Sequence, residues 1–273
     1  MTDPSISTIA FLFYLFASGV FWRQLIEGPK NPEVKLIPFA TGATILAVLF
    51  QVYSLIQGLD LSQGIDLGLT SAMTIVTLII TILFLGAMLF TPMSALGIIV
   101  LPVATITLLI HDTWPSPAVL IGASPVAAIH ILISLTAYGL LSLAAVQAIL
   151  LLLQEHQLRH KHPAGIVRGL PPMEVMETLM VQIVVAGLVA LTLTLFSGIL
   201  FSEQVFGQAL RFNHHILLAI LAWLVYTIFL IGRWRLGWRG RTAIRWVLGG
   251  AVLLALGYFG TKFVLQFLVQ RGA

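Results

Sequence analysis

The chain has no cysteine among its 273 residues, and only 9% of its residues are charged. Without a thiol it cannot form disulfides, ligate an iron–sulfur cluster or relay electrons through a cysteine pair. Soluble domains carry about 25% charged residues. The low charge and the mean hydropathy of +1.04 therefore point to a polytopic membrane protein.

Long apolar runs divide the sequence, and most approach the roughly 20 residues that a helix needs to cross a bilayer. The runs are continuous rather than alternating, which excludes the strands of a membrane barrel. We predict a single all-α domain, residues 1–273, built as a bundle of eight transmembrane helices. The expected spans are 6–22, 37–56, 68–90, 95–110, 126–153, 179–201, 215–231 and 246–269.

Basic residues are distributed unequally between the two sides that eight spans define. Short loops rich in Lys and Arg stay in the cytoplasm, so both termini are expected on the outer, periplasmic side of a bacterial inner membrane. The net charge of +4 then reflects topology and contact with anionic lipid rather than nucleic-acid binding. The basic residues expected on the inner side are Arg23, Lys30, Lys35, Arg159, Lys161, Arg168, Arg233, Arg235, Arg239, Arg241 and Arg245.

Histidines near the outer ends of two spans are the candidate ligands. His130 falls in the fifth span, and His214 and His215 open the seventh, at a similar expected depth. A neutral imidazole is a good iron ligand, and histidines on facing helices can hold a haem in a bundle. Tyr138 lies two turns beyond His130 on the same helix face and could hydrogen-bond to a ligand. Equally, His130 could satisfy an interhelical hydrogen bond while the histidine pair sits in the interface.

Several segments resemble a known family. They are HILISLTAYGLL from His130, LAWLVYTIFL from Leu221, GWRGR from Gly237 and GYFGTKFVL from Gly257. Over residues 130–260 the chain resembles the CcsA/CcmC/HemX superfamily of cytochrome c assembly proteins, and more closely its YpjD-like branch of inner-membrane proteins. In that resemblance His130 matches the first outer haem-ligand histidine of the family, which implies haem b and makes His130 the metal ligand.

The departures from the family pattern are equally specific. Where assembly members carry a tryptophan-rich loop, this chain reads QVFGQALRFNHHIL from Gln204, without the three tryptophans and the aspartate. The family's inner-end histidine corresponds to Ile231, and its last outer histidine has no counterpart. Haem presentation to an apocytochrome through that loop is therefore not expected.

We predict a non-enzymatic inner-membrane protein related to haem-handling assembly proteins, which binds haem b at the periplasmic face through His130. The alternative is a membrane scaffold or partner subunit that has lost haem and docks another membrane protein, partly through residues 155–178. A transporter is disfavoured, because the two halves show no repeat and lack intramembrane carboxylates. No nucleophile–base pair or carboxylate dyad indicates an enzyme.

Overall fold

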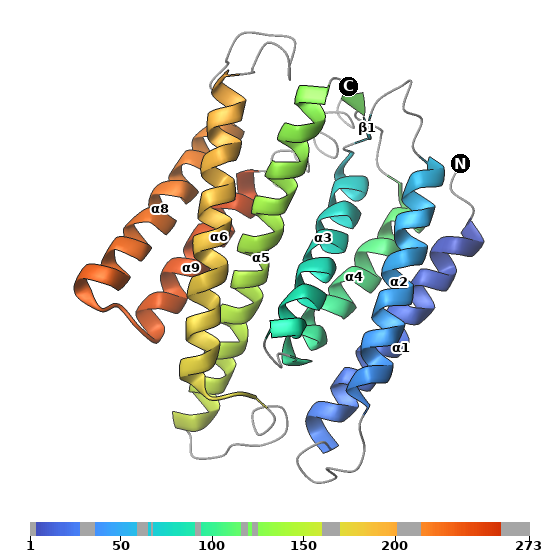
Figure 1. The fold of residues 1–273 in the computed structure, drawn as a ribbon, viewed down its shortest axis with the longest axis horizontal. Helices are drawn as coiled ribbons and strands as arrows, with labels where there is room; N and C mark the ends of the chain where they lie inside the picture. The colour runs from blue at the N-terminus through green and yellow to red at the C-terminus, as the bar shows by residue number, and fades with distance from the viewer. Residues whose placement is uncertain are drawn as a thin grey trace.

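A computed structural model describes residues 4–27, 36–58, 65–66, 68–90, 94–115, 120–121, 125–159, 170–200 and 214–257. These residues form a bundle of long helices (Figure 1). The helices are α1 (Pro4–Glu27), α2 (Ile37–Gly58), α3 (Leu69–Phe90), α4 (Gly97–Thr113), α5 (Pro125–Arg159), α6 (Met173–Leu200), α8 (His214–Leu236) and α9 (Arg241–Ala255). A single 3₁₀ turn, η1 (Ser94–Leu96), precedes α4. Two short strands, β1 (Ile65–Asp66) and β2 (Leu120–Ile121), pair antiparallel.

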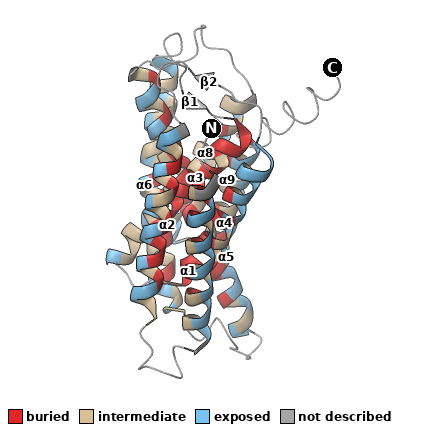
Figure 2. Cartoon of the chain, turned by 90° about the vertical axis from the view of Figure 1, so that its right-hand side faces the viewer, coloured by how far each residue is buried: buried red, intermediate tan, exposed pale blue. Residues whose placement is uncertain are grey.

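The predicted all-α membrane bundle is confirmed. Seven helices, α1 to α6 and α8, are long and apolar enough to cross a bilayer. Their outward faces carry large apolar side chains such as Leu12, Phe16, Leu49, Leu132 and Leu193, and their buried residues gather where helices meet (Figure 2). An apolar exterior suits lipid, because acyl chains are as apolar as leucine. The expected eighth span begins as α9, and its part beyond residue 257 lies outside the described residues.

Several helices extend beyond the boundaries that were predicted for their spans. Helix α5 runs to Arg159 rather than 153, and α6 begins at Met173 rather than 179. Helix α8 ends at Leu236 rather than 231, and α9 begins at Arg241 rather than 246. Hydropathy marks only the part of a helix that lies in hydrocarbon, whereas backbone hydrogen bonds continue through polar residues. The 35 residues of α5 span about 52 Å, well beyond a bilayer core of about 30 Å.

The two ends of the bundle differ in chemistry. At one end α5 and α8 begin and α6 ends, so this end carries His130 and His215 (Figure 1). We call it the histidine end. At the opposite end α5 stops, α6 starts and α8 turns into α9, which brings the polar helix ends and the α8–α9 arginines together. We call it the arginine end. Helices α5, α6, α8 and α9 each extend from one of these ends toward the other.

Hydrogen bonds join the first four helices, each to the next one along the chain. Tyr14 of α1 donates its hydroxyl proton to Gln51 Oε1 of α2 at 2.6 Å, and Gln51 Nε2 donates to the Thr74 carbonyl of α3 at 3.2 Å. Thr77 of α3 and Thr107 of α4 share a hydroxyl contact of 2.9 Å. Polar groups in hydrocarbon cost several kcal/mol when unpaired, so these contacts define how the helices fit together.

Candidate haem site at the histidine end

His130 lies in the second turn of α5 and faces the end of α6. Its side chain is half-buried, and its Nδ1 lies 2.8 Å from Ser197 Oγ of α6. Gly198 lies beside the imidazole, where an added Cβ would lie 3.4 Å from His130 Cε1. The imidazole therefore lies in van der Waals reach of the α6 backbone at Gly198.

The hydroxyls around His130 favour a proton on Nδ1 of the ring. Ser197 Oγ donates to the Thr194 carbonyl at 3.1 Å, so it accepts from His130 Nδ1–H. Ser134 donates to the His130 carbonyl at 2.7 Å, while its Oγ lies 3.5 Å from Nε2. With the Ser134 proton directed to the backbone, His130 Nε2 keeps its lone pair. That tautomer is the one in which Nε2 can ligate a metal.

His215, in the first turn of α8, has a matching arrangement. Its Nδ1 lies 3.0 Å from the carbonyl oxygen of Gly257, which can only accept a hydrogen bond. Nδ1 therefore carries the proton, and the neutral ring has its lone pair on Nε2. The His130 and His215 rings are close enough to interact electrostatically. A Cβ on Gly257 would lie 3.3 Å from Leu218 Cβ, so glycine allows this close approach to α8.

The structure thus brings together two of the four predicted site residues. Tyr138 is buried two turns further along α5. The side chain of His214 lies outside the described residues, as do residues 201–213, where the tryptophan-rich loop of the family would fall. Sequence reasoning missed Ser197, although its position near the outer end of its span gave a signal: a polar residue there shares the depth of His130. The ligand role of these side chains stays a prediction.

The donor set suits haem better than a bare metal ion. No group of three or more His, Cys, Asp or Glu residues converges within the described part of the chain. A protein zinc site needs three or four such ligands, whereas the porphyrin of a haem supplies four nitrogens and leaves only one or two axial positions. Two imidazoles whose Nδ1–H groups are hydrogen-bonded to protein oxygens match the second-shell pattern of metal-ligating histidines.

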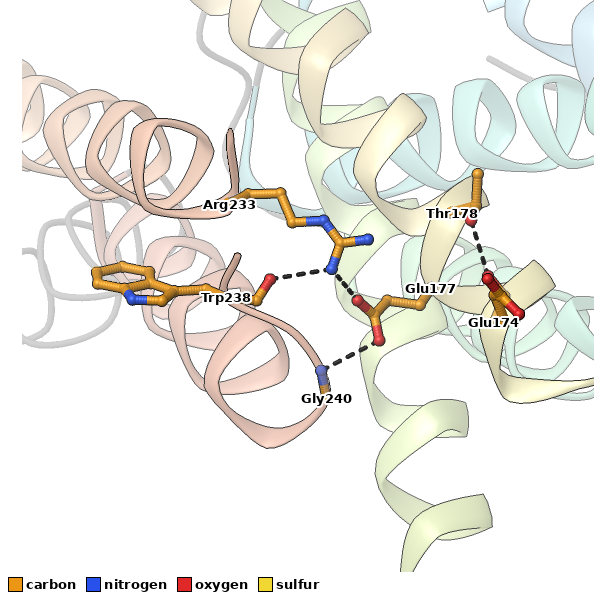
Figure 3. Close-up of polar contacts among 6 residues, drawn as sticks. All are labelled: Glu174, Glu177, Thr178, Arg233, Trp238 and Gly240. Atoms are coloured by element: carbon orange, nitrogen blue, oxygen red, sulfur yellow. Dashed lines mark hydrogen bonds and ion pairs between the residues drawn. The ribbon is translucent and has the colours of Figure 1, made fainter. Parts of the chain in front are cut away.

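At the arginine end, one carboxylate holds the turn between α8 and α9. Glu177 of α6 accepts from Arg233 of α8 through Oε1, and from the Gly240 backbone N–H through Oε2 at 3.1 Å (Figure 3). Arg233 also donates to the Trp238 carbonyl at 2.9 Å. Gly240 adopts φ 56° and ψ −129°, a conformation that a side chain would disfavour. We call Glu177, Arg233, Trp238 and Gly240 the α6–α8 clamp.

Helix α5 adds a second tie to the same turn. Glu155 Oε1 lies 2.9 Å from Arg159 and also 2.9 Å from Arg241, the first residue of α9. The Trp238 ring stacks on Trp246 of α9 with centroids 5.1 Å apart. The ends of α5 and α6 therefore hold the α8–α9 turn, so the helices that present His130, Ser197 and His215 are joined at their far ends.

Comparison with known families agrees with this architecture. The sequence profile described as "Cytochrome C assembly protein" matches residues 37–269. The chain belongs to this family. The match begins at the second helix, so it also includes α2, α3 and α4, which lie before the stretch 130–260 of the sequence resemblance.

Individual relatives support the membership over shorter stretches. The Inner membrane protein YpjD of Escherichia coli is 36% identical over 146 residues, 54% of either chain. An uncharacterized 28.8 kDa protein in the nifR3-like 5′ region of Azospirillum brasilense is 35% identical over 156 residues, 57% of this chain and 58% of the relative. Protein HemX of Brevibacillus brevis is 24% identical over 131 residues, 48% of each. The chain spans about half the length of the curated relatives it matches. No solved structure matches it.

Proposed function

We propose that this protein is a haem-handling component of the bacterial inner membrane that binds haem b at the histidine end of the bundle. The proposal gives His130 of α5 the role of axial ligand and His215 of α8 the role of second ligand. It assigns no catalytic residue, since the Ser197 hydroxyl beside His130 donates its proton to the Thr194 carbonyl rather than to the imidazole.

The observation that carries the proposal is the shared tautomer of the two imidazoles. Each Nδ1 is hydrogen-bonded to a protein oxygen, Ser197 Oγ for His130 and the Gly257 carbonyl for His215, which leaves the lone pair on Nε2. Bound haem would supply an iron centre that can change its redox state, or it would itself be the group that is passed on. The protein would orient the two rings, exclude bulk water through the surrounding helices and fix the imidazole protons on Nδ1. Family membership and the inner-membrane relative support this location and class of ligand.

The test is an absorption spectrum of detergent-purified protein, before and after titration with haem. We expect a Soret band whose intensity reports one haem per chain. His130→Ala should lower haem occupancy at least about tenfold, because the axial bond is lost. His215→Ala should move the spectrum from six-coordinate low-spin toward five-coordinate high-spin iron.

A matched control is His111→Ala, which removes a half-buried histidine at the end of α4 without touching either candidate ligand. It should leave the spectrum unchanged. Wild-type protein that binds no haem at micromolar concentration, or a His111→Ala variant that loses as much haem as His130→Ala, would refute the assignment.

A scaffold without haem is the second candidate, and one observation favours it. The bonds from His130 to Ser197 and from His215 to Gly257 also join α5 to α6 and α8 to the segment after α9 without any ligand. In that case His130→Gln would leave a stoichiometric membrane partner bound during co-purification. Wild-type protein would then stay colourless with added haem.

A further inference from the structure

The α8–α9 turn and the helix ends that flank it carry five arginines, and the structure separates them into two groups. Arg233 and Arg241 are paired with carboxylates of α6 and α5. The other three side chains are exposed and form no ion pair with any acidic residue that the structure describes. These three are Arg235, Arg239 and Arg245. The turn therefore keeps three positive charges that the described part of the bundle does not neutralise.

Arg235 continues the outward-facing apolar stripe of α8. Up to Ile231, the exposed large residues of this helix follow one another at alternating intervals of four and three, and the next position in that series is Arg235. The stripe consists of Leu217, Leu221, Leu224, Ile228 and Ile231. Arg235 consequently lies at the point where the lipid-facing surface of α8 reaches the edge of the membrane.

Arg245 has the same position on α9. From Arg245 onward, exposed positions recur every three or four residues along that segment, at Gly249, Val252 and Leu256. Helices α8 and α9 lie side by side and run in opposite directions (Figure 1), with Arg239 in the turn that joins them. Two apolar stripes on neighbouring helices thus both end in an exposed arginine at the arginine end.

We infer that Arg235, Arg239 and Arg245 form a binding site for the phosphate of an anionic glycerophospholipid, whose acyl chains lie along the exposed stripes of α8 and α9. A guanidinium matches two phosphate oxygens with its paired N–H donors, and it keeps its charge at any physiological pH. Trp234 and Leu236, which are 69% and 70% exposed, flank the site and suit the interfacial layer.

The site is already held in place without the ligand. The α6–α8 clamp fixes the turn, and the Trp238 ring packs against Gly232, where an added Cβ would lie 2.4 Å from it. A soluble acidic protein or a nucleic acid would contact only the arginine side chains. A phospholipid would also cover the apolar residues next to them. The inference is independent of haem binding at the opposite end.

The experiment measures lipid selectivity of the full-length protein by native mass spectrometry, after equilibration in detergent with equal amounts of phosphatidylglycerol and phosphatidylcholine. Each arginine near an anionic surface contributes roughly a fivefold preference. Wild-type protein should therefore prefer phosphatidylglycerol, and R235Q/R239Q/R245Q should lower that preference on the order of 100-fold. The matched control is K30Q/K35Q/K161Q, which removes the same charge elsewhere in the chain and should keep most of the preference.

The inference is overturned if the arginine variant prefers phosphatidylglycerol as strongly as the wild type does. It is also overturned if both triple variants lose the preference equally, because the preference would then depend only on the net charge of the protein. An excess of inorganic phosphate should not displace the bound lipid. Displacement would assign the arginines to free phosphate and overturn the lipid site.

If the arginine variant does not insert into the membrane, a fluorescence experiment on the wild-type protein still tests the lipid site. In nanodiscs of phosphatidylcholine, a small fraction of phosphatidylglycerol with brominated acyl chains should quench tryptophan fluorescence more than the same fraction of brominated phosphatidylcholine. High salt should abolish the difference. Equal quenching by the two lipids refutes the site.

Discussion

Replacing Glu177 by glutamine should destabilise the bundle measurably, because this carboxylate joins α6 to both sides of the α8–α9 turn. The side chains of Glu177 and Arg233 are only 14% and 15% exposed. Glutamine keeps the shape and one carbonyl oxygen but removes the charge that faces the guanidinium. A hydrogen bond to a charged group contributes about 1.5–3 kcal/mol, so we expect E177Q to lower the free energy of unfolding by about 2 kcal/mol.

Alanine at the same position should cost more. It would leave the Arg233 charge with the Trp238 carbonyl as its remaining clamp acceptor, and it would remove the acceptor of Gly240 N–H. Breaking one partner of a buried pair costs about 3–5 kcal/mol. The measurement is equilibrium unfolding of the purified protein by titration with sodium dodecyl sulfate in mixed micelles, followed by tryptophan fluorescence.

Glu174→Gln is the matched control, since it makes the same charge change one turn earlier on α6. The Glu174 side chain is exposed, and its contact in Figure 3 is a backbone carbonyl that accepts from Thr178. E174Q should change stability by less than about 0.5 kcal/mol. In a double-mutant cycle, E177Q and R233Q should couple by at least about 1 kcal/mol. An E177Q variant as stable as E174Q, or strict additivity with R233Q, refutes the clamp.

Three further outcomes follow from the packing and the candidate site. Gly187→Ala places a Cβ 2.6 Å from the Leu141 side chain and should destabilise the α5–α6 contact by about 1–3 kcal/mol, while Gly249→Ala, with nothing within 4 Å, should be neutral in the same titration. Gln51→Leu removes both buried contacts of that side chain and should lower stability by about 1–3 kcal/mol; no change would show that the α1–α3 contacts are dispensable. Ser197→Ala should weaken haem affinity roughly tenfold in a spectroscopic titration, whereas Ser142→Ala, three turns from His130, should not.

Much of the fold could be predicted because the hydropathy of a segment depends only on residues that are neighbours in the sequence. Continuous apolar runs locate the helices α1 to α6 and α8. The predicted helix ends were wrong where polar residues continue a helix beyond its apolar run, as at the end of α5. Hydropathy cannot distinguish a polar helix turn from a polar loop, and only hydrogen bonding along the backbone separates the two.

The candidate site was predicted in part. His130 and His215 were expected at a similar depth, and they lie at the same end of the bundle within electrostatic range. Ser197, the hydrogen-bond partner of His130, is 67 positions away, and no local pattern connects the two. Glu177 pairs with Arg233 56 positions later, and no local pattern connects these two residues either.

The sequence by itself determined the membrane class, the order of the seven spans that the described residues show, and which polar residues share an end of the bundle. Those properties depend on how far along a helix each residue lies, and the rise per residue is constant. The tertiary structure alone decided which hydroxyl lies beside His130, which two of the five arginines are paired and which three are exposed. Those outcomes depend on the rotation of each helix about its own axis and on its depth relative to its neighbours, both of which are set by packing between distant segments.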